Sequence, residues 1–426
     1  MAGIALGRAA FGLALVLALA SPAAAQPAGR ALEAPDEAIR AAVLAEMSRL
    51  GIPGLTLAVA EGGNVRFEAG FGFADVENGV PARPETVYRL ASVSKPMTAV
   101  AVLHLAEQGS LDLDAPVWRY CPDFPEKPWP VTARQLLCHQ GGVRSYRPDE
   151  PAETRRFESF ADALSLFRDD PLVHEPGTGV RYSTYGYNLL GCAAASAART
   201  SFVSLLREVV FGPAGMTATG ADDLREITAH RAQGYVRDAE GRLRNSALAD
   251  MSCKVPGGGL SGTAADVARF GSALASGRLL SQATRDQMLT RQATRDGRLT
   301  GYGLGLTLGE REGRPEAWHT GGQERVSNAL YLSLDRRVPG GGRSVAILTN
   351  LERVQPEMLA LARLIVGGTL RRVPPLTPPA TLAGVNPARF AVRCSEPLLL
   401  LPSLAVTSDS FPKSGNPLAC HWWPRG

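Results

Sequence analysis

The sequence predicts a mixed α/β fold, in which an antiparallel sheet flanked by N- and C-terminal helices carries an inserted, mainly helical subdomain. Three observations predict it. A helix and a hairpin open the domain, helical patterns and loops dominate residues 110–255, and strand patterns followed by a helix close the domain. Because strand-rich segments lie at both ends, we expect a single sheet completed by the two ends of the chain.

The first expected element is an amphipathic helix over residues 36–50, whose apolar residues share one stripe. Gly51-Ile52-Pro53-Gly54 stops this helix. Two short apolar runs follow, 55–60 and 65–71, and the Glu-Gly-Gly-Asn segment between them is typical of a hairpin turn. These runs are therefore expected to be the first two strands of the sheet.

The next expected helix covers residues 92–108 and stops at Gly109. Beyond it, helical periodicity alternates with loops, and turn-rich stretches then separate short apolar runs typical of antiparallel strands. We expect helices at 157–167, 186–198, 202–210, 264–276 and 356–366, and strands at 302–308, 316–319, 326–334 and 344–349.

Both termini differ in composition from the 36–370 domain. Arg8, an apolar run and the small residues that end at Ala25 have the layout of a secretory signal peptide over residues 1–25. We therefore expect a periplasmic or secreted protein. Residues 373–426 have four prolines near their start, at 374, 375, 378 and 379, and show little periodicity, so we expect a disordered, Pro-rich tail.

Composition excludes several classes of function. The net charge of +4 arises from 45 basic and 41 acidic residues mixed along the chain, so we expect no nucleic-acid partner. After the signal, no segment reaches eighteen uninterrupted apolar residues, so the mature chain is expected to have no membrane span. The six cysteines and six histidines lack metal-site spacing, so we expect no metal and no cofactor. The compartment permits a disulfide, but the spacing assigns none.

The strongest chemical signal is Ser92-Val93-Ser94-Lys95 at the start of an expected helix. Residues three apart share one helix face, so the Lys95 amine can approach the Ser92 hydroxyl. A serine needs a base to become a nucleophile, and a lysine serves as one when burial or neighbouring cations favour its neutral form. The same spacing recurs at Ser410 and Lys413, but Pro412 and the absence of an apolar helix pattern mark that match as accidental.

Two further motifs follow at the edges of expected elements. Tyr182-Ser183-Thr184 precedes the helix expected at 186, and its tyrosine can relay a proton if a nearby cation stabilises the phenolate. His319-Thr320-Gly321-Gly322 lies at the end of an expected strand, and its paired glycines permit close backbone approach by a ligand. Each motif alone has an ordinary structural explanation.

Taken in order, the S-x-x-K, Y-x-T and H-T-G motifs resemble the serine β-lactamase family, whose relatives include penicillin-binding proteins, esterases and D-amino-acid peptidases. The stretches 182–187 and 319–322 look most similar to the mitochondrial β-lactamase-like serine protease branch. Leu136-Leu137-Cys138-His139 resembles a further loop of the family. The resemblance covers about residues 36–370 and implies a β-lactamase/transpeptidase-like fold.

The resemblance implies an acyl-enzyme mechanism without a cofactor. Ser92 attacks a carbonyl group, Lys95 and Tyr182 manage the proton, and the backbone N–H groups of Ser92 and Gly322 hold the oxyanion. The remaining positions implied to bind substrate are His319, Thr320, Gly321 and Thr184.

Two departures from the family pattern bear on the substrate, which we expect to be a small molecule or peptide-like. Thr184 replaces a common Asn, and His319 replaces the Lys that binds a carboxylate in true β-lactamases, which favours an amide or ester substrate. One alternative is a β-lactamase or D-Ala-D-Ala carboxypeptidase. Another is a non-catalytic module that binds peptidoglycan or a partner protein. The absence of a G-x-S-x-G motif disfavours an α/β-hydrolase.

Overall fold

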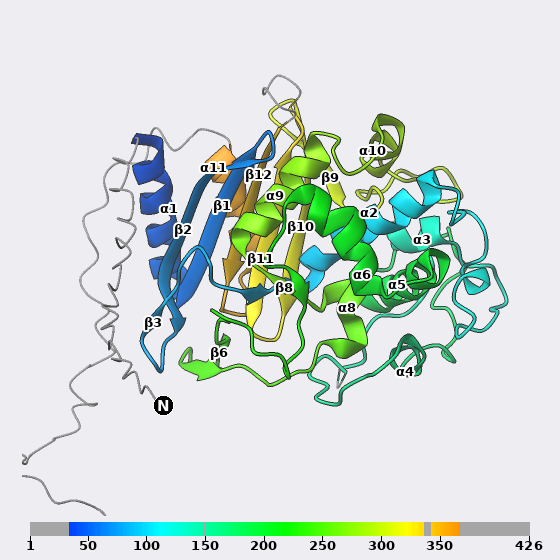
Figure 1. Cartoon of the computed structure of the whole chain (residues 1–426), viewed down its shortest axis with the longest axis horizontal. Coiled ribbons are helices and arrows are strands. Elements are labelled where there is room, and N and C mark those ends of the chain that lie inside the picture. The colour runs from blue at the N-terminus through cyan, green and yellow to red at the C-terminus, as the bar shows by residue number, and fades with distance from the viewer. Residues whose placement is uncertain (1–33, 149, 336–341, 367–426) are drawn as a thin grey trace, which may run out of the picture. The chain divides into compact units, whose positions relative to one another are not determined.

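The computed structural model describes residues 34–148, 150–335 and 342–366. The predicted signal peptide and tail lie outside these ranges. A seven-stranded antiparallel sheet forms the centre of the described chain, with strand order β3-β2-β1-β12-β11-β10-β9 (Figure 1). The bounds are β1 Gly54–Glu61, β2 Asn64–Asp75, β3 Val80–Pro81, β9 Thr307–Arg311, β10 Arg314–Gln323, β11 Val326–Ser333 and β12 Arg343–Thr349.

The two ends of the described chain complete this sheet, as the sequence predicted. Strand β1 pairs with β2 on one side and with β12 on the other, so that Leu57 lies opposite both Ala69 and Ile347. The β1 side chains alternate between two cores: Leu55 and Leu57 belong to one, whereas Ala58 and Ala60 belong to the other. Alternation of this kind places a buried strand between helices on both faces.

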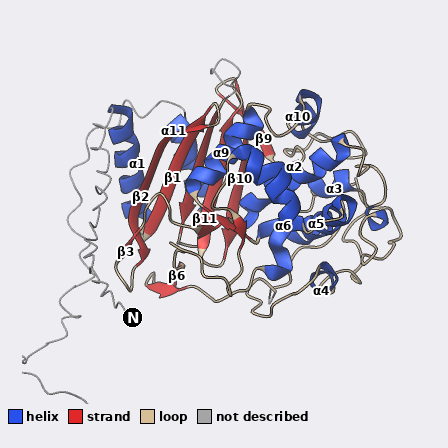
Figure 2. Ribbon diagram, in the orientation of Figure 1, coloured by secondary structure: helices blue, strands red, loops and turns tan. Residues whose placement is uncertain are grey.

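Helices cover both faces of the sheet (Figure 2). Helices α1 (Ala34–Leu50) and α11 (Gln355–Val366) pack together on one face, and α9 (Ala264–Ala275) packs on the other. Helix α1 begins at Ala34, two residues before the expected start at 36, so Asp36 lies in its first turn. The expected bounds of α9 (264–276) and α11 (356–366) agree with the structure to within one residue.

The segment between β2 and α9 is largely helical, with short strands beside it. Helix α2 (Ser94–Glu107) and α5 (Thr184–Ala198) are packed together and against α8 (Val255–Gly258). The remaining bounds are α3 Ala133–Leu137, α4 Phe160–Leu164, α6 Phe202–Leu206, α7 Gly212–Ala214, α10 Gln282–Met288, β4 Tyr88–Arg89, β5 Gly220–Ala221, β6 Tyr235–Arg237, β7 Leu243–Asn245 and β8 Leu260–Gly262.

The strand expected at 302–308 is wrong, because β9 begins only at Thr307. Glycines interrupt the apolar run: Gly305 has φ +95°, and a Cβ at Gly303 would lie 2.2 Å from the Met288 carbonyl oxygen. The backbone therefore bends at residues 304–306, before the strand begins, and Tyr302 forms an isolated antiparallel bridge with Thr307 across this bend.

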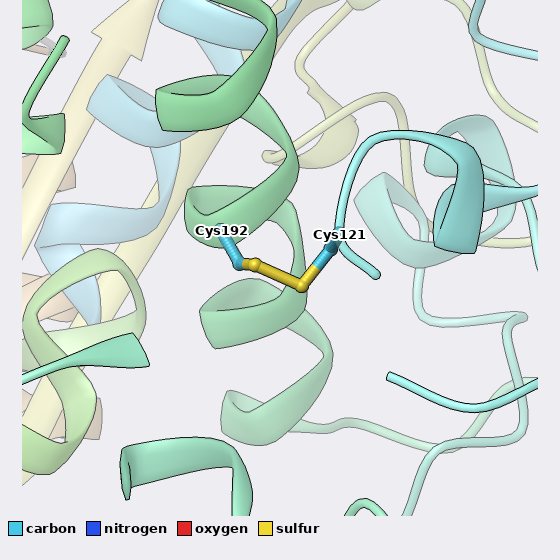
Figure 3. Close-up of a disulfide and its surroundings, with 2 residues drawn as sticks. All are labelled: Cys121 and Cys192. Carbon is cyan, nitrogen blue, oxygen red and sulfur yellow. A yellow bond between two sulfur atoms is a disulfide. The ribbon is translucent and has the colours of Figure 1, made fainter. Parts of the chain in front are cut away.

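A disulfide joins Cys121 to Cys192 within the helical region, and Figure 3 shows it linking a loop to α5. The sequence left this pairing open. Cys138 and Cys253 are free and buried. In the described ranges, no single helix is long and apolar enough to cross a membrane, although the bent pair Thr184–Ala198 and Phe202–Ala214 together reach that length and composition.

Candidate active site

Ser92 lies in a short 3₁₀ turn, Ala91–Val93, that leads directly into α2. The expected helix therefore begins two residues late, at Ser94. Ala91 has φ +50°, which is uncommon for a residue with a side chain and is often found where a functional side chain must be held in position. Even with this turn, Lys95 Nζ lies 3.1 Å from Ser92 Oγ, as the spacing predicted.

Lys95 is fully buried and makes only neutral contacts. Its amine lies 3.2 Å from Thr184 Oγ1 and 2.5 Å from the Gly257 carbonyl oxygen. No carboxylate among the described residues pairs with it. Burial holds the pKa of Lys95 well below its ordinary value, and the nearby Lys254 lowers it further. Both effects favour the neutral amine, which is the form that can accept a proton from serine.

Tyr182 lies in the loop before α5, with its ring centroid 4.8 Å from Lys95 Nζ. Ser183 caps the helix by accepting a hydrogen bond from the Gly186 N–H, which fixes where this loop ends. Although 38% of Tyr182 is exposed, desolvation of the phenol raises its pKa above the ordinary value, and Ser92 opposes this shift only in part. The neutral phenol is thus favoured over the phenolate that the sequence suggested.

The His319-Thr320-Gly321-Gly322 motif lies in the last part of β10, which ends one residue later at Gln323. Pairing with β9 stops at Trp318, so this part of β10 lies beside the Ser92 turn instead. A Cβ at Gly321 would lie 2.6 Å from the Leu90 carbonyl oxygen and 3.3 Å from the Ser92 nitrogen. Only glycine permits this approach, which brings the two backbone segments together.

His319 is buried, and its Nδ1 lies 2.7 Å from the Thr320 carbonyl oxygen, so Nδ1 carries the proton. Burial, followed by the nearby Lys95, lowers the pKa of His319 to about 3. The ring is consequently neutral at ordinary pH. Its centroid lies 6.2 Å from that of Tyr182, which places both rings near Lys95.

His139 is the main component of this site that the sequence did not select. Its ring lies 4.3 Å from the Tyr182 ring and 5.0 Å from the Tyr302 ring, centroid to centroid. Nδ1 accepts a hydrogen bond from the Ser183 N–H, so this loop and the Tyr182 loop are tied together. Burial, followed by the charge of Lys95, lowers its pKa well below the ordinary value. The family-like loop around Leu136 was the available signal.

The Gly257 carbonyl was also not selected from the sequence. The available signal was the run of three glycines, 257–259. Thr98 Oγ1 donates to the Pro256 carbonyl at 2.7 Å, which anchors α8 on α2 and directs the next carbonyl toward Lys95. A Cβ at Gly257 would lie 2.5 Å from Thr184 Cγ2. The described residues contain no group of three or more His, Cys, Asp or Glu side chains arranged for a metal ion.

Comparison with known proteins places this arrangement in a family. The model of the beta-lactamase family matches residues 39–368. The chain belongs to the beta-lactamase family. This confirms the resemblance found in the sequence, and it places the chain among serine hydrolases of the beta-lactamase type.

Members of this family with curated descriptions match part of the chain. The human mitochondrial serine beta-lactamase-like protein LACTB is 31% identical over 297 residues, covering 54% of each chain. Penicillin-binding protein 4* of Bacillus subtilis is 29% identical over 301 residues, covering 66% of each chain. The chain thus spans about half the length of the first of these relatives.

A solved structure confirms the fold. The D-amino acid amidase of Ochrobactrum anthropi superposes with a TM-score of 0.67 at 23% identity, covering 79% of this chain and 99% of that one. The mixed α/β architecture with an antiparallel sheet is therefore that of the beta-lactamase and penicillin-binding-protein fold.

Proposed function

We propose that the protein is an exported serine hydrolase that forms an acyl-enzyme on Ser92 and acts on a peptide-like amide or an ester. The 3.1 Å approach of a desolvated lysine amine to the Ser92 hydroxyl carries this proposal. An amine with a lowered pKa beside a serine is the arrangement that activates a weak nucleophile.

In the proposed reaction, neutral Lys95 removes the hydroxyl proton as Ser92 Oγ attacks the substrate carbonyl carbon. The backbone N–H groups of Ser92 and Gly322 stabilise the resulting oxyanion. Tyr182, a neutral phenol, donates its proton to the leaving amine or alkoxide and regains one from protonated Lys95. Water then attacks the acyl-enzyme by the reverse proton transfers, which release the acid and restore Ser92.

The substrate preference is inferred from His319 and Thr320, which we propose orient the substrate beside Gly321 and Thr184. A histidine with a pKa near 3 carries no charge at neutral pH, so it offers no permanent partner to a substrate carboxylate. This supports an amide or ester over a carboxylate-bearing β-lactam. Among the similar structures, the D-amino acid amidase was solved with L-phenylalanine amide, which makes amino-acid amides a suitable first substrate class.

Export is proposed from two independent features. The first 25 residues have the layout of a signal peptide, and the described chain contains the Cys121–Cys192 disulfide. Disulfides form and persist mainly in oxidising compartments. Together they support a periplasmic or secreted location.

The proposal is tested with three substrate classes and one control. Wild type and Ser92→Ala are assayed with a p-nitrophenyl ester, phenylalanine amide and benzylpenicillin. We expect turnover of the ester or the amide by wild type alone. Faster turnover of benzylpenicillin would instead support the β-lactamase alternative. Failure of all three, together with no covalent adduct on Ser92, would support a non-catalytic binding module.

A further inference from the structure

Three arginines surround one aspartate behind the Ser92 turn. Arg89 on β4 and Arg325 just after β10 line a small cavity together with Arg231 and Asp222. The cavity is small, with a volume of about 10 Å³, so it holds one small species. The other lining residues are Val87, Tyr88, Ala232, Ser261 and Val326.

Two buried guanidinium nitrogens in this cluster have no hydrogen-bond partner within the described chain. Arg89 donates from Nε to Asp222 at 2.7 Å and from Nη2 to the Ala249 carbonyl at 2.6 Å, which leaves Nη1 unpaired. Arg325 donates from Nη2 to Gln233 Oε1 at 2.5 Å, which leaves Nε unpaired. Both residues are more than nine-tenths buried. A buried charged donor without an acceptor is costly, so both nitrogens call for an acceptor.

The charges around the cavity do not balance. Asp222 is the only carboxylate among the described residues that line it, and it pairs with Arg89 and, at 3.4 Å, with Arg231. Glu352 lies near Arg325 but accepts its backbone N–H, at 3.0 Å, rather than its guanidinium. Three cations therefore face one anion. Arginine does not relieve such an excess by losing its proton, even though burial and Arg89 lower the pKa of Arg325.

The backbone is shaped to hold Arg325 in this position. Arg325 has φ +82°, a conformation that L-residues rarely adopt. A Cβ at Gly234 would lie 2.1 Å from the Arg325 Cβ, so the arginine packs directly over a glycine. Strained backbone of this kind persists where the surrounding structure requires it. The backbone at Arg325 and the packing against Gly234 thus hold the Arg325 side chain in this position.

We propose that this cavity binds a single monovalent anion of the size of chloride, held by Arg89 Nη1 and Arg325 Nε. The anion supplies the missing acceptor to both nitrogens and offsets part of the excess positive charge. Arg89 lies three residues before Ser92, and Arg325 lies three residues after Gly322, so the bound anion joins the two backbone segments that meet at the candidate active site.

The direct test is bromide, which replaces chloride and scatters X-rays anomalously. Crystals of the wild-type protein grown without halide are soaked in sodium bromide, and anomalous difference density is calculated. The proposal predicts a peak between Arg89 and Arg325. A cavity that contains only water under these conditions would overturn it.

A solution measurement separates a specific site from an adventitious ion. The melting temperature is measured while chloride replaces gluconate at constant ionic strength. We expect a saturable rise for wild type, as for any ligand that binds the folded state. The rise should persist in Arg225→Met, which removes an exposed arginine, and should disappear in Arg325→Met. A crystal peak without this rise in wild type would mean an adventitious ion only and would also overturn the proposal.

Discussion

The close approach of β10 to the Ser92 turn can be tested at Gly321. In Gly321→Ala the new Cβ would lie 2.6 Å from the Leu90 carbonyl oxygen and 3.2 Å from the Ala91 Cβ. An ordinary contact needs 3.4–4 Å, so the two segments must separate by about 0.8–1.4 Å. Neither atom nearest to the Cβ belongs to a long flexible side chain, so the backbone itself must move.

That movement has two expected consequences of different size. Overpacking costs about 1–3 kcal/mol of folding free energy, which a domain of this size tolerates. Displacement of the Ser92 N–H from the Gly322 N–H changes the geometry of the oxyanion site that we propose, and a shift approaching 1 Å lowers reaction rates by about 100-fold. We therefore expect acylation of Ser92 to slow by about 10- to 100-fold, while the protein stays folded.

The assay is the second-order rate constant for labelling of Ser92 by a fluorophosphonate, together with the free energy of unfolding in urea. Gly220→Ala is the matched control, because a Cβ at Gly220 meets nothing within 4 Å. It should label at the wild-type rate. Wild-type labelling by Gly321→Ala would refute the argument that this glycine sets the distance between the two segments.

Three further predictions concern buried groups. Lys254→Met removes a cation that lowers the pKa of Lys95, so the pKa of Lys95 should rise. The acid limb of the pH profile of the Ser92 labelling rate should therefore move to higher pH. The control Lys127→Met should leave this limb in place. Replacing Cys121 and Cys192 by Ser opens a cross-link between residues 71 apart in sequence and should lower the free energy of unfolding by about 2–4 kcal/mol in urea titrations. His319 has a pKa of about 3 in the folded protein and an ordinary value of 6.5. As the pH falls, the His319 ring is therefore protonated in the unfolded chain before it is protonated in the folded protein. Stability should fall as pH drops from 6.5 toward 3, with a smaller slope in His319→Gln, measured by denaturant titration at each pH.

Local patterns in the sequence predicted much of the fold and the order of the site motifs. The short apolar run at 55–60 predicted a strand, which the structure buries on both faces, and the three-residue spacing of Ser92 and Lys95 brought their side chains together despite the unexpected 3₁₀ turn. These features depend on backbone periodicity, which a sequence displays directly.

What the sequence missed depends on contacts between distant segments. The Gly257 carbonyl reaches Lys95 from 162 residues away, and Lys254 affects the same amine through space. His139 joins the site by packing against Tyr182. The Cys121–Cys192 pairing likewise needs a loop to meet α5. No local pattern encodes such contacts, because they arise only once the chain is packed.

The central claim, that Ser92 is an activated nucleophile, is tested most directly by intact-protein mass spectrometry. Wild type and Ser92→Ala are incubated with a fluorophosphonate probe and, separately, with benzylpenicillin. The account predicts one probe adduct on wild type and none on Ser92→Ala, with the modified peptide containing Ser92. Equal labelling of both proteins, or no labelling of a folded wild type, would contradict it.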